Sequence, residues 1–183
     1  MSSILKRSSK FLSLVLRHQP EKIGLQLSSD GWAEVDPLLD KMQQAGLEIN
    51  LELLQKVVSE NDKQRFTFNE NQTRIRANQG HSISVDLQLA PALPPDLLFH
   101  GTADRFWSSI QVEGLTKRSR QHVHLSADRE TASKVGRRHG KLLLLLIDAV
   151  AMHQQGHLFY QSKNGVWLTR AVPPQFLSID HSL

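Results

Sequence analysis

The feature that most constrains this 183-residue chain is a short proline-rich segment near its middle, residues 90–95, which reads Ala-Pro-Ala-Leu-Pro-Pro. Proline fixes its backbone and lacks the N–H that helices and interior strands need, so the segment predicts a linker. At roughly 100–200 residues per domain, the length suits one domain or two small lobes. We therefore predict a first lobe with its linker over residues 1–93 and a second lobe over residues 94–183.

The first lobe has the sequence pattern of three helices followed by a β-hairpin, which is the order of a winged helix. The predicted helices are 3–18, 36–45 and 50–60, and the predicted strands are 32–35, 64–68 and 73–77. Asp36, which precedes Pro37, is expected to cap the second helix, and Asn50 is expected to cap the third.

The second lobe alternates short apolar runs with two helical patterns and predicts a compact α+β arrangement around a curved sheet. The predicted strands are 97–100, 122–126, 142–147, 157–160, 166–168 and 176–179, and the predicted helices are 104–113 and 128–139. Residues 136–140 (Gly-Arg-Arg-His-Gly) end the second helix, where a glycine C-cap is expected and a phosphate contact is the alternative. The fold class is therefore α+β.

The distribution of charge along the chain indicates the kind of partner that the protein binds. Residues 1–93 carry 11 basic and 11 acidic side chains, whereas residues 94–183 carry 11 basic and 7 acidic ones, which accounts for the net charge of +4. The segment 117–141 alone has eight basic residues against two acidic ones. This concentration of charge indicates an anionic partner, a phosphate-rich ligand or nucleic acid, unless it is only a solvated basic face.

Cysteine is absent, which excludes disulfides, a thiol nucleophile and cysteine-based metal sites. The longest apolar run, residues 142–147, is far too short to span a bilayer, and the first residues lack the apolar stretch of a secretory signal. We therefore expect a cytoplasmic protein without a membrane partner, and we expect a monomer.

Arg17 and His18 come together where the first predicted helix ends. Such a pair can bind a phosphate through charge-assisted hydrogen bonds, or it can simply complement the helix dipole. Arg65 lies on a predicted strand beside Phe66, which is expected to face the core. Arg65 is therefore expected on the opposite face, where it contacts either a nucleic-acid backbone or only solvent.

In the second lobe, a predicted buried strand ends at His100 and is followed by Gly101 and Thr102. The glycine would let a ligand approach the backbone. A histidine packed in the core is the alternative. If residues 122–126 form a strand, two histidines and Ser126 share one face. A His-x-His on a strand can hold zinc, but the chain has no cysteine, nearby third histidine or paired carboxylate, so we expect a phosphate or polar ligand and no metal.

Taken together, these segments resemble the RNA (tRNA) 2′-phosphotransferase family, whose bacterial members are of the KptA type. The resemblance covers about residues 3–180 and lies in Arg17-His18-x-Pro20, Arg65-Phe66, His100-Gly101-Thr102, Arg120-x-His122-Val123-His124-Leu125-Ser126 and Asn164-Gly165-Val166-Trp167. It implies an N-terminal winged-helix lobe and a C-terminal ADP-ribosyltransferase-like lobe. No Rossmann glycine pattern, P-loop or serine nucleophile elbow occurs in the chain.

The resemblance also implies a reaction, with NAD⁺ as co-substrate and a tRNA-like RNA as partner. An internal RNA 2′-phosphate attacks the nicotinamide ribose, which gives ADP-ribosylated RNA and nicotinamide. The ribose 2″-hydroxyl then attacks the phosphate, which gives 2′-OH RNA and ADP-ribose 1″,2″-cyclic phosphate, as in tRNA splicing or RNA repair.

The family's catalytic residues match four positions here, Arg17, His18, Arg65 and Arg120. The expected NAD⁺-binding residues are His100, Gly101, Thr102, His124, Ser126, Asp128 and Gly136. Many ADP-ribosyltransferases place a glutamate where this chain has Val166. A carboxylate there would repel an incoming phosphate, so a neutral side chain suits a phosphate acceptor.

Two alternatives remain open. The protein could be an ADP-ribosyltransferase that modifies a terminal phosphate of RNA or DNA, or a protein side chain. It could also be a non-catalytic winged-helix nucleic-acid-binding protein, although its charge-neutral first lobe lacks the basic patch that a duplex binder needs.

Overall fold

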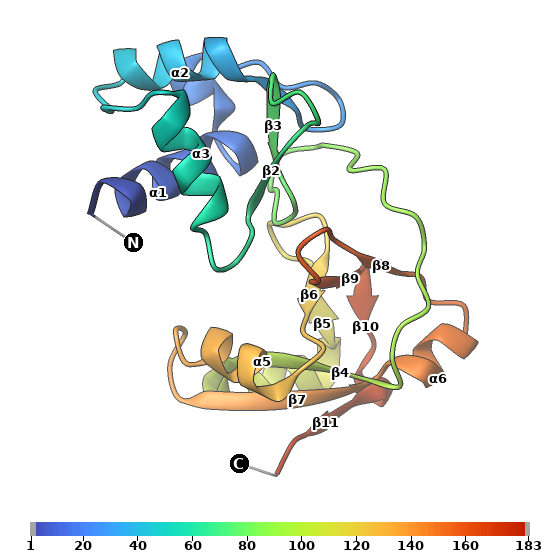
Figure 1. Cartoon of the computed structure of the whole chain (residues 1–183). Coiled ribbons are helices and arrows are strands. Elements are labelled where there is room, and N and C mark those ends of the chain that lie inside the picture. Colours follow the sequence, from blue (N-terminus) through green and yellow to red (C-terminus); the bar gives the residue numbers. More distant parts are fainter. Residues whose placement is uncertain (1–2, 182–183) are drawn as a thin grey trace. The chain divides into compact units, whose positions relative to one another are not determined.

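The computed structural model describes residues 3–181, and the chain divides into two compact units, Met1–Gln88 and Leu89–Leu183, called here the N-terminal and C-terminal units (Figure 1). The prediction placed the second lobe from residue 94. The proline-rich segment instead belongs to the C-terminal unit, because Pro91 forms an isolated β-bridge with Tyr160 and the Ala92 amide donates to the Phe159 carbonyl (2.8 Å). In each unit separately, helices accompany antiparallel strands, which confirms the α+β class.

The N-terminal unit contains the predicted three helices and hairpin. Its elements are α1 (Ser3–Arg17), η1 (Pro20–Ile23), β1 (Ala33–Glu34), α2 (Val35–Gln44), α3 (Leu51–Ser59), β2 (Phe66–Phe68) and β3 (Arg74–Ala77). The strands form an antiparallel sheet in the order β1-β3-β2. Its core is apolar, and its fully buried large side chains are Leu12, Leu16, Leu38, Met42, Leu54, Phe66 and Ile75.

Two helix starts in this unit test the capping predictions. Asn50 caps α3 as predicted, and its side chain accepts from the Leu53 amide (2.9 Å). The predicted cap Asp36 is wrong, because α2 begins one residue earlier, at Val35, directly after β1. The Val35 amide donates to the Thr73 carbonyl (2.8 Å), so the hairpin already satisfies the first amide of the helix and no side-chain cap forms.

The C-terminal unit contains all the predicted strands, with shifted bounds. They are β4 (Leu97–Ala103), β6 (Val123–Leu125), β7 (Leu142–Asp148), β8 (Phe159–Gln161), β9 (Trp167–Thr169) and β11 (Leu177–Ile179). Two antiparallel sheets result, in the orders β11-β7-β4 and β6-β9-β8. They are joined where the Phe99 and Ser126 amides each donate to the other's carbonyl (2.9 and 2.8 Å).

Several of the shortest elements were not predicted. A two-stranded sheet pairs β5 (Leu115–Thr116) with β10 (Ala171–Val172), and α6 (Ala149–Gln154) follows β7 directly. The short helices η2 (Asp104–Phe106) and η3 (Pro174–Phe176) complete the unit, and η2 leads into α4 (Trp107–Glu113).

Helix α5 (Arg129–Gly136) packs on β4 and β7 through an unusually close backbone contact (Figure 1). A Cβ built on Gly101 would lie 1.8 Å from the Ala132 carbonyl oxygen, and one on Gly136 would lie 2.9 Å from the Thr102 amide nitrogen. The predicted glycine C-cap of this helix is wrong. The helix ends at Gly136 and not near residue 139, so Arg137 occupies the cap position, and Gly136 lies inside the last turn, where the helix touches the strand.

Candidate active site

In the N-terminal unit, three predicted site residues gather around the end of α1. Arg17 is the last residue of that helix, His18 follows it, and Arg65 immediately precedes β2. Nη2 of Arg17 donates to the Arg65 carbonyl oxygen (3.3 Å), which ties the helix end to the start of the strand. We call Arg17, His18 and Arg65 the basic cluster.

The buried amide of Asn61 orients the side chain of Arg65 in the basic cluster. Nη1 of Arg65 donates to Oδ1 of Asn61 (3.2 Å), and Nδ2 of the same Asn61 donates to the Ser9 hydroxyl (3.2 Å). Asn61 is 1% exposed, so its geometry is fixed by the core. The guanidinium of Arg17 lies 5.8 Å from the centre of the Phe66 ring. The arginines are therefore oriented by the fold before any ligand binds.

A second support comes from residues 78–82, which sequence reasoning did not connect with the site. The Asn78 amide donates to the Arg65 carbonyl (2.8 Å), and the Ser82 amide donates to the Arg17 carbonyl (2.9 Å). The Ser82 hydroxyl lies 2.9 Å from Nδ1 of His18. These contacts join residues far apart in a stretch without regular secondary structure, so no local sequence pattern reveals them.

Within the same stretch, His81 is 1% exposed, and neither ring nitrogen has a hydrogen-bond partner among the described residues. Burial, together with the positive charges of Arg17, His18 and Arg76, lowers the pKa of His81 to about 4. His81 is therefore neutral at physiological pH, chiefly because burial disfavours its charged form.

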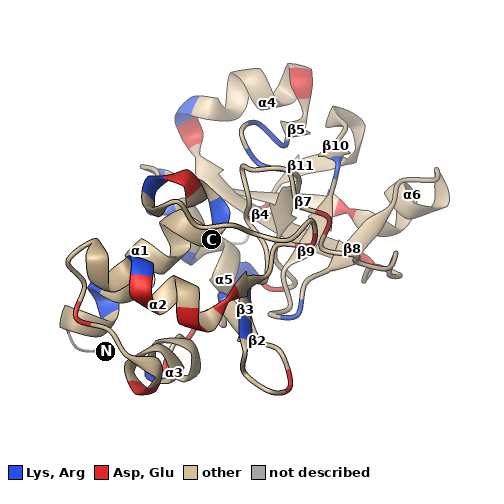
Figure 2. Cartoon of the chain, turned by 90° about the horizontal axis from the view of Figure 1, so that it is seen from above, with Lys and Arg blue, Asp and Glu red and all other residues tan. Residues whose placement is uncertain are grey.

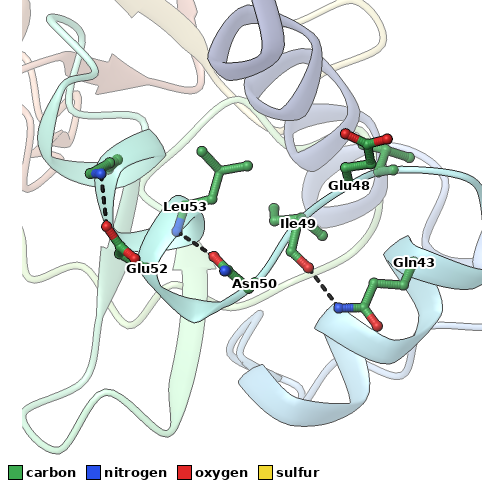
Figure 3. A pocket seen from close by; sticks show the side chains of 8 residues that line it. Gln43, Glu48, Ile49, Asn50, Glu52 and Leu53 are labelled. Atoms are coloured by element: carbon green, nitrogen blue, oxygen red, sulfur yellow. Dashed lines mark hydrogen bonds and ion pairs between the residues drawn. The ribbon is translucent and has the colours of Figure 1, made fainter.

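A separate hollow lies on the N-terminal unit between the end of α2 and the start of α3 (Figure 3). It contains the Asn50 cap and a hydrogen bond from Gln43 to the Ile49 carbonyl (2.6 Å). Among the described residues that line it, Lys56 and Glu52 form an ion pair (2.8 Å) on the helix surface. Because none of the predicted site residues lines this hollow, we assign the chemistry to the basic cluster and not to it.

In the C-terminal unit, His100 of β4 connects to the neighbouring sheet. Its Nδ1 lies 3.0 Å from the His124 carbonyl oxygen, and because a carbonyl only accepts, Nδ1 carries the proton. Burial, with the nearby charges of His139 and Arg120 as smaller causes, lowers the pKa of His100. The neutral ring therefore keeps Nε2 as a hydrogen-bond acceptor.

Arg120 lies on the exposed turn that follows β5, where the Arg120 amide donates to the Lys117 carbonyl (3.0 Å). Figure 2 shows basic positions on this loop. Nη1 of Arg120 lies 3.5 Å from Nδ1 of His124, so within this unit the structure brings together Arg120, His124 and His100.

Several predicted cofactor residues have clear structural roles. Asp128 caps α5 and accepts from the Thr131 amide (2.7 Å), while Ser126 bridges to β4 through its backbone. The missing side chains of Gly101 and Gly136 make room for the helix–strand contact. Thr102 is buried at 8% exposure. Contact of any of these residues with a dinucleotide stays a prediction.

Val166 lies at the end of a tight turn between β8 and β9. The Ser162 amide donates to the Val166 carbonyl (3.0 Å), and the Val166 amide donates to the Ser162 hydroxyl (3.2 Å). Ser162 is 4% exposed, so a buried residue fixes the backbone at this neutral position.

The donor set points to anion binding. Arginine side chains offer planar groups of N–H donors that match phosphate oxygens, and histidine adds a donor whose proton can move near neutral pH. Residues 3–181 include no group of three or more histidines and carboxylates that could hold a metal ion. Among the helices of these residues, none is long and apolar enough to cross a bilayer.

A family profile described as "RNA 2'-phosphotransferase, Tpt1 / KptA family" matches residues 4–171. A "Probable RNA 2'-phosphotransferase" of Hahella chejuensis is 56% identical over 179 residues, which cover 98% of this chain and 96% of that protein. A protein of the same name from Flavobacterium johnsoniae is 55% identical over 175 residues, with 96% of each chain covered. This chain therefore belongs to the RNA 2′-phosphotransferase, Tpt1 / KptA family.

Proposed function

We propose that this protein is an NAD⁺-dependent RNA 2′-phosphotransferase that removes an internal 2′-phosphate from RNA. The observation that carries the proposal is the basic cluster, because hydrogen bonds hold Arg17, His18 and Arg65 at the end of α1 and the start of β2. The chain also belongs to a family that is named for this reaction. Its fold would be that of a winged-helix lobe joined to an ADP-ribosyltransferase-like lobe, and the helix order and three-stranded sheet of the N-terminal unit support the first half of that assignment.

The acceptor is already an anion, so the enzyme must position it and balance its charge instead of deprotonating it. An oxygen of the RNA 2′-phosphate forms a bond to C1″ of the NAD⁺ ribose, while the bond to nicotinamide breaks and nicotinamide leaves with the electron pair. We assign Arg17, Arg65 and Arg120 to the phosphate oxygens, because guanidinium groups stabilise the charge that develops during phosphoryl transfer.

In the second step, the ribose 2″-hydroxyl attacks phosphorus and the RNA 2′-oxygen leaves. The hydroxyl loses a proton and the leaving oxygen gains one, and we assign the contact with the phosphate, with proton transfer at Nε2, to His18. The products are 2′-OH RNA and ADP-ribose 1″,2″-cyclic phosphate.

The C-terminal unit carries donors and acceptors that fit a dinucleotide. His100 offers an acceptor at Nε2, and basic side chains of the turn after β5 suit a pyrophosphate. We propose that His100, Thr102, His124 and Ser126 line the NAD⁺ site, with Gly101 and Gly136 shaping its floor and Asp128 at its edge. Bound NAD⁺ would supply the electrophilic ribose carbon.

The test is an assay of a short RNA with one internal 2′-phosphate, with and without NAD⁺. We expect NAD⁺-dependent loss of the phosphate by the unmodified protein and none by Arg120→Ala. Arg170→Ala is the control, because it removes the same charge from another exposed position of the same unit. Equal turnover by the Arg120 variant and its control would remove Arg120 from the site, and phosphate loss without NAD⁺ would contradict the proposed reaction.

A further inference from the structure

The hydrogen bond between Ser82 and His18 has a chemical consequence for the basic cluster. We propose that Ser82 is a positioning residue, whose hydroxyl holds the His18 ring in both of its protonation states and so directs the chemistry to Nε2. This inference rests on the proposed function, in which His18 contacts the transferred phosphate. Ser82 itself need not touch the substrate.

Ser82 contacts the end of α1 through both its backbone and its side chain. Its backbone amide donates to the carbonyl of Arg17 (2.9 Å), the residue that precedes His18. The residue before Ser82 is His81, whose ring is buried in the unit. The hydroxyl oxygen lies 2.9 Å from Nδ1 of His18. The backbone of Ser82, an exposed residue, is therefore anchored to the same turn of chain that carries the histidine.

A hydroxyl can hold the imidazole through a complete protonation cycle because it both donates and accepts. When His18 is neutral, Ser82 can donate to Nδ1, which places the ring proton on Nε2. When His18 is protonated, Nδ1–H donates to the same oxygen. The ring keeps its orientation in either state, and Nε2 carries a proton in both, so that it presents a donor to the phosphate.

His100 of the C-terminal unit shows what a different partner does. There Nδ1 faces a carbonyl oxygen, which only accepts, so the neutral ring must keep its proton on Nδ1 and offers an acceptor at Nε2. A carboxylate partner would also fix the ring, but its negative charge would oppose a phosphate nearby. Serine is the neutral partner that still permits a donor at Nε2, which suits a histidine facing an anion.

The test compares Ser82→Thr with Ser82→Val, two side chains of similar shape that differ by a hydroxyl against a methyl group. In single turnovers of the 2′-phosphorylated RNA, we expect Ser82→Thr to stay close to the unmodified protein and Ser82→Val to be roughly tenfold slower. The same two changes at Ser84, an exposed serine of the same stretch, are the control and should leave the rate unchanged. Ser82→Ala replaces Ser82→Val if the valine variant melts earlier.

The second readout does not depend on activity. Long-range ¹H–¹⁵N spectra report the state of each histidine ring, and His18→Gln identifies the His18 signals by their loss. We expect the Nδ1 resonance of His18 to move in Ser82→Val and not in Ser82→Thr, with the other histidine signals unchanged. Equal rates for the two variants, or an unchanged His18 resonance in Ser82→Val, would overturn the inference. An unmodified protein inactive on the RNA would contradict the proposed function instead, while the spectra would still decide the role of Ser82.

Discussion

The basic cluster of the N-terminal unit and Arg120 of the C-terminal unit carry the same kind of charge, but the fold holds them differently. Arg65 is half-buried and bonded to the buried Asn61, and a backbone carbonyl receives the guanidinium of Arg17. Arg120 is exposed on a turn, and the contact of its side chain with His124 is a long one, 3.5 Å. The first arrangement is rigid before binding, whereas the second can adjust to its ligand.

This difference assigns distinct tasks to the two kinds of arginine. A preorganised donor stabilises a transition state without reorganising at the moment of reaction, so errors in its geometry are costly. A donor on an exposed turn loses side-chain freedom when it binds, but tolerates small changes in length. The comparison predicts that conservative changes hurt the basic cluster more than the turn.

The largest effect is expected at Arg65. Arg65→Lys keeps the charge but loses the planar group that bonds to Asn61, so we expect a rate loss of about 100-fold to 1,000-fold in the 2′-phosphate assay. Arg120→Lys should lose only roughly tenfold. Arg74→Lys, an exposed change on neighbouring β3, is the control. Equal losses at positions 65 and 120 would break the comparison.

The next effect concerns the scaffold of the C-terminal unit. Gly101→Ala places a Cβ 1.8 Å from a backbone carbonyl of α5, which cannot move without displacing the helix, so we expect a loss of about 3 kcal/mol in the stability of this unit. Gly156→Ala, which meets no atom within 4 Å, should cost only about 1 kcal/mol for its positive φ. Hydrogen exchange should locate the loss in the C-terminal unit, and uniform loss over both units would contradict this explanation.

A smaller effect is expected in the pH dependence of the stability of the N-terminal unit, through the buried His81. The pKa of His81, about 4, lies below its ordinary value of 6.5, so the unfolded chain binds the proton first as the pH falls. Stability should therefore be complete above about pH 6.5 and decline toward pH 4, by at most about 3 kcal/mol from this group. His81→Leu should remove this decline, and it should not destabilise the unit at pH 7, because it deletes two buried nitrogens without partners.

The control for this change is His181→Leu, at an exposed position. It should leave the acid-side decline in place. Denaturant unfolding between pH 4 and 7, followed by hydrogen exchange in the N-terminal unit, measures both variants. A decline that persists unchanged in His81→Leu would show that another group causes it.

The smallest effect is expected at Val166. Val166→Glu should slow the reaction by roughly tenfold to fiftyfold if a carboxylate at this turn repels the incoming phosphate. Val166→Gln has nearly the same size without the charge and should be much less impaired. If the two variants are slowed alike, size and not charge explains the neutral residue.

Much of the fold was predictable because its signals are local. Asn50 before an apolar helix and the paired strands 66–68 and 74–77 follow from spacing and capping alone. The start of α2 was misplaced because a hydrogen bond from the hairpin, distant in sequence, replaces the side-chain cap. Strands of two residues, such as β5 and β10, carry too few residues to show a period. Helix α6 had a usable signal, since Asp148 caps it by accepting from the Ala151 amide.

The site residues likewise divide into those that the sequence indicates and those that only the structure reveals. Arg17, His18 and Arg65 could be singled out by residue type and position, because each stands at the end or edge of a predicted element. Asn61 and Ser82 could not, because their importance lies in contacts across the fold. Gly101 was expected to make room for a ligand, and the structure shows that its missing side chain makes room for a helix.

The most direct test of the central claim is a single turnover of the 2′-phosphorylated RNA with NAD⁺, in which RNA and nucleotide products are followed together. We expect ADP-ribosylated RNA that rises and then decays, as 2′-OH RNA and ADP-ribose 1″,2″-cyclic phosphate form in equal amounts. A stable ADP-ribosylated RNA would contradict it and indicate a transferase without the second step. NAD⁺ that is never consumed would contradict it entirely and indicate a protein that only binds nucleic acid.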